Sequence, residues 1–368
     1  MNWEPDRLDD QGLLTEGDPS GMLRAVAASA AQIRTSRRAA LESALPSIAR
    51  DGRPRAIVVA GLGGAGTAGD ILNAVCGYGA PLPVLTVRSY RLPGWIGATD
   101  LVIVVSRSGR TEETLAVAAE AVRRGCRLLA VGGPDSPLQA VARQAGAPFV
   151  PVEPDGSARA ALWSLTVPLI VAAAELGLIV AGEDVFEETA RRLEDIAHRC
   201  RPASESFINP GKSLAMEIAE TVPMIWGSTP LTAVAARRWA SQLNENGKYP
   251  ATWGEIPGSD HSQLAVLDGP LARRDVFADD GGRAVRLFVL RDVEEHRQVT
   301  RRCEAVLRLA EDRDVRVTQV TGEGTHPLER LAVLIELGDF ASTYLALGYG
   351  IDPSAVAAIT ELKARVSQ

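Results

Sequence analysis

The sequence has few of the residues that build metal centres, disulfide frameworks and nucleic-acid interfaces. Its 368 residues include only four cysteines, with no C-x-x-C spacing, and four histidines that do not cluster. Its 39 basic side chains against 46 acidic ones give a net charge of −7. These shortages argue against a disulfide-stapled fold, a metal hydrolase and broad binding to nucleic acid or anionic membranes.

The sequence also lacks the apolar segments that direct a chain to a membrane or out of the cell. The acidic stretch Met1 to Asp10 contains no secretory signal. Leu162 to Val180 is apolar enough to resemble a membrane span, but it contains Pro168 and Glu175 and has no basic flanks. We expect it to form a helix buried in a core or a subunit interface, and we expect a cytoplasmic protein with reduced cysteines.

Length and patterning predict two α/β domains. A chain of this size corresponds to two domains of roughly 150 residues each. Short β-branched runs alternate with longer helical patterns through both halves, which is typical of doubly wound parallel sheets. We expect two flavodoxin-like domains, residues 20–200 and 205–368, separated by a polar, proline-containing stretch. Predicted strands cover residues 56–60, 83–87, 101–105, 127–131, 149–152, 222–226, 284–290 and 315–320. Predicted helices cover residues 22–45, 67–75, 111–124, 231–243, 293–310 and 326–347, and a last helix follows residues 352–353.

A glycine-rich turn follows the first predicted strand. Gly61-Leu62-Gly63-Gly64-Ala65-Gly66 opens a helix and fits the G-x-G-x-x-G fingerprint of dinucleotide sites. That fingerprint also needs an acidic residue some twenty positions on, and residues 86–90 contain none, so only an NADP site using Arg88 stays open. A tight turn without a ligand is the plain alternative. The pattern favours a helix start whose backbone, at Gly63 and Gly64, binds a phosphate or sugar.

A loop rich in hydroxyl groups follows the third predicted strand. Ser106, Ser108 and Thr111 stand at the start of the next predicted helix, beside its unbonded N–H groups. Such a set can hold a phosphomonoester without a metal. The alternative is an ordinary helix cap, which needs one hydroxyl rather than three. The sequence therefore favours a phosphate site.

Together these residues resemble the sugar isomerase (SIS) domain superfamily and, more closely, the bifunctional phosphoglucose/phosphomannose isomerases, which carry two SIS domains in one chain. The resemblance spans roughly residues 22–363. It implies an isomerase, without metal or cofactor, that interconverts glucose 6-phosphate and mannose 6-phosphate with fructose 6-phosphate through a cis-enediol. It also implies a homodimer with shared active sites. Its further markers are Arg159, Asn244-Glu245-Asn246-Gly247-Lys248, His261, Gly338-Asp339, Ile351-Asp352-Pro353 and Leu362-Lys363.

The resemblance assigns catalytic roles to four of these residues. Glu245 would move the proton between the two sugar carbons. Arg159 would stabilise the enediolate, while Lys363 and a His261 from the partner subunit would open the ring. Each has a plainer interpretation: Glu245 as a solvated carboxylate paired with Lys248, Lys363 as a cation complementing a helix dipole, and His261 and Arg159 as exposed loop residues.

The sequence departs from the family pattern at three places. Ala65 replaces the serine of the glycine turn, which removes a hydrogen bond worth about 1 kcal/mol. Gly258 and Ser262 stand where the motif P-E-x-x-H-N around the histidine has Glu and Asn, and Arg107 replaces a loop tyrosine. Three alternative functions therefore stay open: a non-catalytic sugar-phosphate-binding regulatory protein, an NADP-dependent oxidoreductase, and an enzyme that transfers or epimerises amino-sugar phosphates.

Overall fold

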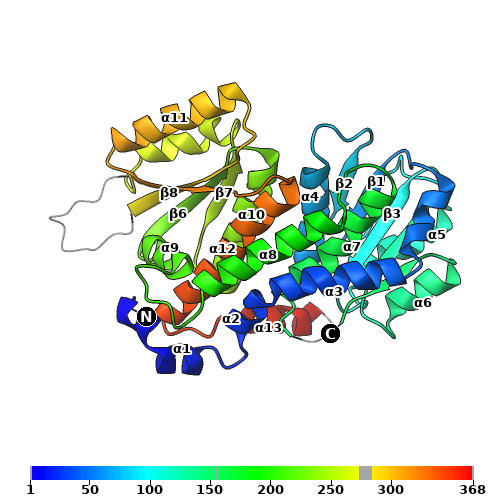
Figure 1. The fold of residues 1–368 in the computed structure, drawn as a ribbon, viewed down its shortest axis with the longest axis horizontal. Helices are drawn as coiled ribbons and strands as arrows, with labels where there is room; N and C mark the ends of the chain where they lie inside the picture. Colours follow the sequence, from blue (N-terminus) through cyan, green and yellow to red (C-terminus); the bar gives the residue numbers. More distant parts are fainter. Residues whose placement is uncertain (1, 154–155, 273–283, 367–368) are drawn as a thin grey trace. The chain divides into compact units, whose positions relative to one another are not determined.

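The computed structural model describes residues 2–153, 156–272 and 284–366 and contains two parallel β-sheets, one in each half of the chain (Figure 1). Contacts divide the chain into two compact units. The sheet-A unit consists of Ala28–Leu193 with His326–Leu328, and the sheet-B unit consists of Met1–Ala27, Glu194–Thr325 and Glu329–Gln368. The N-terminal helices thus belong to the unit of the second sheet.

Sheet A has five parallel strands in the order β2-β1-β3-β4-β5. This is the flavodoxin-like order expected from the sequence. The strands β1 and β3 are buried at every residue, as central parallel strands must be. The strands are β1 (Ile57–Ala60), β2 (Val84–Val87), β3 (Leu101–Ser106), β4 (Arg127–Gly132) and β5 (Phe149–Pro151).

Helices cover both faces of sheet A. On one face, α5 (Glu112–Arg123) and α6 (Pro137–Gln144) pack apolar side chains against alternate residues of β1, β3 and β4. On the other face, α4 (Gly64–Cys76) and α3 (Ser29–Glu42) both pack against α7 (Leu162–Glu175). Both faces of the sheet are therefore shielded from water. A site can form only at the carboxyl edge, where the strands end, or at the amino edge, where they begin.

Sheet B repeats the same architecture with four parallel strands in the order β7-β6-β8-β9. The strands are β6 (Thr221–Gly227), β7 (Thr252–Glu255), β8 (Ala284–Arg291) and β9 (Arg316–Thr321). The main helices of this unit are α1 (Gln11–Gly17), α2 (Met22–Ala27), α9 (Pro210–Ile218), α10 (Pro230–Glu245), α11 (Arg297–Glu311), α12 (Pro327–Gly348) and α13 (Ala357–Val366). The α8 helix (Glu183–Arg199) crosses the division between the two units. Short 3₁₀ helices are η1 (Pro5–Asp9), η2 (Leu45–Asp51), η3 (Ser259–His261) and η4 (Gln263–Asp268).

All eight predicted strands are present within one or two residues of their expected ends. The single helix expected over residues 22–45 is wrong: α2 ends at Ala27, α3 begins at Ser29, and η2 follows. The helix expected from residue 293 begins at Arg297, because His296 caps it by accepting a hydrogen bond from Gln298 N. Sequence patterning did not detect β7, α6 or α9.

Two apolar helices are buried in the protein core. The expected buried helix at residues 162–180 is confirmed as α7, which spans 14 residues and is almost wholly buried. The 22-residue α12 helix has the length and hydropathy of a membrane span, but its most apolar 18-residue window is entirely buried inside the structure. It also carries Arg330 and Asp339, which form ion pairs with Asp292 and Arg238. We therefore interpret α12 as the core helix of the sheet-B unit.

Candidate functional site

The glycine turn (Gly61–Gly66) and the hydroxyl loop (Ser106–Thr111) follow neighbouring strands at the carboxyl edge of sheet A. The strands β1 and β3 pair side by side, with Ala60 opposite Val104. The sheet order sends the connections after β1 and β3 to opposite sides, so their loops border a crevice between them. Such a switch point is where doubly wound sheets bind ligands. The structure thus brings the two sequence motifs to one place.

The glycine turn leaves its helix start open. Gly63 is the N-cap of α4 in the left-handed conformation (φ 53°), with no side-chain cap bond. A Cβ added at Gly63 or Gly64 would meet no atom within 4 Å. In contrast, a Cβ at Gly66 would lie 2.7 Å from Arg88 Nε. Backbone N–H groups at an uncapped helix start with open space are suited to bind an anion.

Arg88 is engaged within this turn. Its guanidinium donates to Gly66 O at 3.0 Å and to the carboxylate of Asp70. The Arg88 side chain therefore holds the glycine turn against β2. An arginine that binds a ribose phosphate would instead extend into open space. The geometry disfavours the NADP site that the sequence left open.

The hydroxyl loop differs from an ordinary helix cap. Thr111 is the N-cap of α5, but its hydroxyl makes no cap bond. Instead Thr111 Oγ1 lies 2.9 Å from the buried Ser106 Oγ. The exposed Ser108 hydroxyl accepts from Arg110 N at 3.2 Å. The first turn of α5 thus keeps its N–H groups uncapped by Thr111, with hydroxyls gathered beside them.

Close backbone packing fixes the shape of the hydroxyl loop. Gly109 has φ 61°, and a Cβ there would lie 2.1 Å from Ser136 Oγ. A Cβ at Gly132, the last residue of β4, would lie 2.4 Å from Ser106 O. Only glycine fits at both positions, so the loop is seated on the end of β4.

The loop after β5 completes this edge of sheet A. It carries Arg159, which is half-buried. Arg107, between the two serines, donates from Nη2 to Gly156 O at 2.8 Å. Arg107 therefore links the hydroxyl loop to the segment that carries Arg159.

Glu245 is the last residue of α10 in the sheet-B unit and is half-buried. The helix is anchored on α12 by a buried ion pair, Arg238 Nη2 to Asp339 Oδ2 at 2.8 Å. Burial raises the pKa of Asp339, although the charge and hydrogen bonds of Arg238 oppose that shift. Beyond Glu245, Asn246 Nδ2 donates to Ser342 Oγ at 3.0 Å. Contacts on both sides therefore fix the position of Glu245.

Gly338, a marker from the sequence, makes the α10–α12 packing possible. A Cβ at Gly338 would lie 2.2 Å from Trp239 Cδ1. The Trp239 indole Nε1 donates to Leu334 O at 2.6 Å. Gly338 thus provides the space for the Trp239 ring that holds α10 in place.

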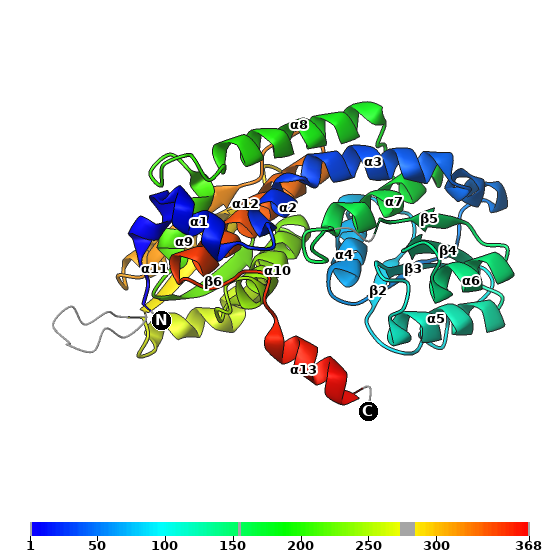
Figure 2. The same ribbon diagram turned by 90° about the horizontal axis from the view of Figure 1, so that it is seen from below.

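Lys248 ties the Glu245 segment to the end of the chain. Its ammonium donates to the carbonyls of Asn246 (3.0 Å), Asp352 (2.8 Å) and Pro353 (3.2 Å). The chain then enters α13, which carries the exposed Lys363 and buries none of its residues; Figure 2 shows this helix projecting from the rest of its unit. Lys248 therefore positions the base of the helix that carries Lys363.

His261 lies in η3, after β7, and its side chain is 69% exposed. Its Nε2 lies 3.5 Å from Arg302 Nη1 and 4.0 Å from Asp260 Oδ1. Sequence reasoning assigned no role to Asp260 or Arg302, because Asp260 stands at a variable position of the motif around the histidine and Arg302 lies outside it.

Within the sheet-B unit, Glu245 and His261 lie at opposite edges of the sheet. The segment after Glu245 is at the amino edge, where Tyr249 Oη donates to Thr221 O at 2.7 Å at the start of β6. The segment before His261 is at the carboxyl edge, where Ile256 N donates to Gly227 O at the end of β6. A seven-residue strand separates the edges by about 20 Å. The segments that carry Glu245 and His261 therefore lie at opposite ends of β6.

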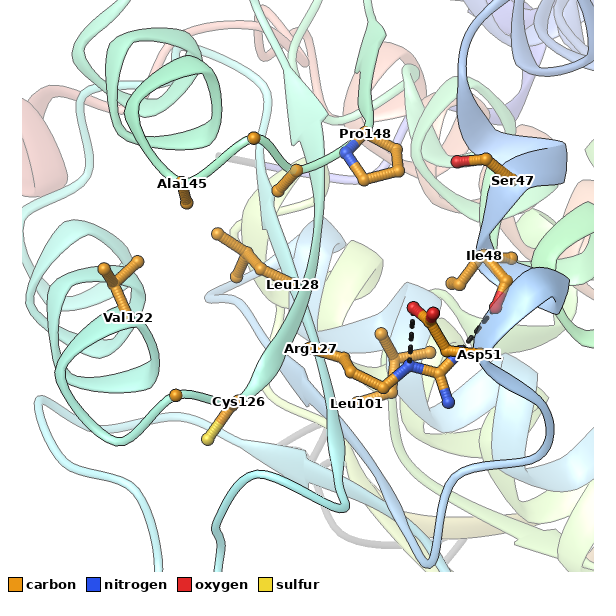
Figure 3. A pocket seen from close by; sticks show the side chains of 13 residues that line it. Ser47, Ile48, Asp51, Leu101, Val122, Cys126, Arg127, Leu128, Ala145 and Pro148 are labelled. Atoms are coloured by element: carbon orange, nitrogen blue, oxygen red, sulfur yellow. Dashed lines mark hydrogen bonds and ion pairs between the residues drawn. The ribbon is translucent and has the colours of Figure 1, made fainter.

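The amino edge of sheet A holds a cavity of about 420 Å³ at the starts of β3 and β4 (Figure 3). Arg127 bridges its wall by donating to Gly52 O at 2.8 Å and to Ile48 O, and by pairing with Asp51. None of the site residues expected from the sequence lines it. Across the described ranges 2–153, 156–272 and 284–366, no group of three or more His, Cys, Asp or Glu side chains could hold a metal ion.

Comparison with known proteins gives consistent results for sequence and structure. Residues 207–366 match the family described as bacterial phospho-glucose isomerase C-terminal SIS domain. A bifunctional phosphoglucose/phosphomannose isomerase of Caldicellulosiruptor bescii is 31% identical over 314 residues, covering 85% of this chain and 89% of that protein. A protein of the same description from Aquifex aeolicus is 30% identical, covering 86% and 92%. The crystal structure of a glucose-6-phosphate isomerase from Chlamydia trachomatis superimposes with a TM-score of 0.71 at 16% identity, covering 94% of this chain and 77% of that one, which supports the fold.

Proposed function

The chain belongs to the family of bifunctional phosphoglucose/phosphomannose isomerases, and from that premise we propose that it interconverts glucose 6-phosphate and mannose 6-phosphate with fructose 6-phosphate. The observation that carries this proposal is the hydroxyl loop. Ser106 and Thr111 hydroxyls lie 2.9 Å apart at a helix start that neither caps, across a crevice from the open glycine turn. Hydroxyl and backbone N–H donors in this arrangement suit a sugar phosphate.

In the proposed reaction the phosphate binds Ser106, Ser108 and Thr111, with backbone donors from Gly63 and Gly64. Glu245 takes the proton from C2 of the open-chain aldose, and the C1 carbonyl becomes part of a cis-enediolate. Arg159 stabilises the negative oxygen of that intermediate. Glu245 returns the proton to C1 while the hydroxyl proton moves from O2 to O1, which yields the ketose.

Ring opening precedes this transfer. It needs a proton removed from the O1 hydroxyl and one supplied to the ring oxygen. We assign these steps to Lys363 and to the partner subunit's His261. The placement of the Glu245 and His261 segments at opposite ends of β6, a strand about 20 Å long, supports a homodimer in which each site draws its histidine from the other chain.

We also propose a cytosolic location. All four cysteines are free thiols and three of them are buried. Burial raises the pKa of Cys76 and Cys303 to about 11, which keeps both thiols protonated and unreactive. Structural thiols of this kind fit a reducing compartment.

Substitution of Glu245 tests the function. Glu245→Gln keeps the shape of the side chain but removes the base, so kcat should fall by about 10²- to 10⁴-fold. Binding of hexose 6-phosphate, measured by calorimetry, should change little. Conversion of both aldose phosphates is followed with deuterium at C2.

Glu311→Gln is the matched control, because Glu311 is the last residue of α11 as Glu245 is of α10, and it is exposed. Its kcat should equal that of the wild type. A Glu245→Gln chain with wild-type turnover would exclude the assigned base. A wild-type chain that binds hexose 6-phosphate without converting it would favour the regulatory binding protein.

A further inference from the structure

The structure fixes the backbone around His261 but leaves its ring dependent on neighbouring side chains. Before His261, the buried Ser259 packs so closely on β7 that a Cβ at Gly254 would lie 1.8 Å from Ser259 Oγ. After it, Gln263 accepts from Trp226 Nε1 at 2.7 Å and donates to Trp253 O at 3.0 Å. The loop is therefore anchored on both sides. The imidazole is 69% exposed, so packing alone does not orient it.

Asp260 is the acidic group of this loop. Its side chain is only 7% exposed; Oδ1 accepts from Gly258 N at 2.8 Å and Oδ2 accepts from Arg302 Nη1 at 2.6 Å. Burial alone would raise the pKa of Asp260, but the hydrogen bonds from Gly258 and Arg302 and the charge of Arg302 outweigh it and hold the pKa below its usual range. Asp260 is thus an ionised carboxylate in a fixed position.

Gly258 turns the backbone so that its N–H meets the Asp260 carboxylate. Gly258 has φ 144°, a conformation that side chains with a Cβ rarely adopt. The glutamate of the family motif would therefore strain this turn at position 258. A carboxylate two residues later binds the N–H of Gly258 instead.

Arg302 brings a cation to the same ring from α11. Its Nη1 lies 3.5 Å from His261 Nε2 while it bonds Asp260. A guanidinium N–H can only donate, so Arg302 bonds the ring only in the tautomer whose Nε2 accepts and whose Nδ1 carries the proton. Asp268 and Arg313, which line the same pocket as Asp260 and His261, pair with each other at 2.9 Å.

We infer that Asp260 and Arg302 are the positioning residues of His261, which hold its Nε2 so that the protonated Nδ1 faces the sugar ring oxygen of the partner subunit's site. This inference rests on the proposed function. The Asp260–Arg302 pair acts on ring opening and not on proton transfer between carbons.

The test separates those two steps. Ring opening is measured as catalysed exchange between the α and β anomers of glucose 6-phosphate by exchange NMR, and proton transfer as deuterium loss from C2. Asp260→Asn and Arg302→Gln should each slow anomer exchange by roughly 10- to 100-fold, less than loss of a complete acid–base group. The affinity for glucose 6-phosphate should be unchanged, and Arg302→Lys should recover part of the rate.

Two further variants make the result specific. Asp268→Asn is the matched control, since Asp268 also pairs with an arginine, Arg313, which follows the end of α11, and its side chain is 69% exposed. It should exchange anomers at the wild-type rate. Glu245→Gln should keep anomer exchange and lose C2 exchange. Asp260→Asn with wild-type anomer exchange, or with lowered substrate affinity and thermal stability in parallel, overturns the inference. If the wild-type protein catalyses C2 exchange but not anomer exchange, the inference about Asp260 and Arg302 is wrong while the proposed isomerase function stands. If it catalyses neither exchange, both the inference and the proposed function are wrong.

Discussion

The carboxyl edges of the two sheets share a topology and differ in chemistry. In sheet A the crevice between β1 and β3 is bordered by open glycines and by the hydroxyls of Ser106 and Thr111. In sheet B the corresponding crevice, between β6 and β8, is bordered by the buried side chains of Asp292 and Glu295. The carboxyl edge of sheet A thus carries hydrogen-bond donors for an anion, whereas the carboxyl edge of sheet B carries carboxylate side chains.

The carboxylates of sheet B are neutralised internally. Arg330 of α12 pairs with Asp292 at 2.8 Å and with Glu294 at 2.7 Å. Glu295 accepts from Arg291 at 2.6 Å. Burial would raise the pKa of Glu295, but hydrogen bonds from Arg291, Ser228 and Thr300 outweigh it and lower the pKa overall. Topology therefore offers two candidate crevices, and the residues that follow β3 and β8 determine which can bind a phosphate.

The largest effect is expected at the sheet-B edge, on stability. Arg330→Met leaves the buried Asp292 carboxylate without its cation, which should destabilise the protein by about 3–5 kcal/mol. The urea midpoint should fall, while the KM for hexose 6-phosphate of the folded fraction should stay the same.

Arg313→Met provides the control, since its exposed pair with Asp268 contributes less than about 1 kcal/mol. A raised KM in Arg330→Met would mean that the sheet-B edge takes part in binding, and the contrast between the edges would fail.

The next effect is expected at the sheet-A edge, on affinity. Ser106→Ala and Thr111→Val each remove a hydroxyl from the proposed phosphate site, a loss of about 1.5–3 kcal/mol, so KM should rise by about 10- to 150-fold. The unfolding midpoint should change little, because the Thr111 hydroxyl caps no helix.

Thr229→Val is the mirror-image control at the sheet-B edge. Thr229 caps α10 in a capping box with Thr232, so its loss should cost about 1 kcal/mol of stability and leave KM unchanged. Equal effects of the two threonine substitutions on KM would contradict the assignment of the phosphate to sheet A.

The smallest effect tests the glycine turn. Ala65→Ser should restore a hydroxyl that the family pattern has and this chain lacks, and should tighten hexose 6-phosphate binding by about fivefold, equivalent to about 1 kcal/mol. Calorimetry measures the change. Unchanged or weaker binding would show that the turn does not contact the phosphate in this way.

The strands were predictable because burial on both faces leaves a continuous apolar signal. Residues 101–105 are Leu-Val-Ile-Val-Val and form β3 as expected. The edge strand β7 escaped prediction because its four residues, Thr-Trp-Gly-Glu, include glycine and a charge and are half-exposed. The two motifs of sheet A could be assigned to one crevice because strand order alone brings them together.

The partners of the other site residues could not be predicted. Lys248 was weighed as an ion pair with Glu245, and nothing in the motif indicated that its ammonium binds carbonyls that lie more than 100 residues later in the chain. Arg302 reaches His261 from a helix 41 residues away. Such contacts depend on how helices pack against a sheet, and neither hydrophobic period nor local motif spacing encodes that packing.

The placement of Glu245 and His261 at opposite ends of β6 has a consequence for inheritance. In the proposed dimer each sugar contacts Glu245 from the amino edge of sheet B in one chain and His261 from the carboxyl edge of sheet B in the other chain. Two chains damaged at different ends would still hold, between them, one complete set of catalytic groups. Harmful alleles of such a gene can therefore compensate each other when both are expressed in one cell.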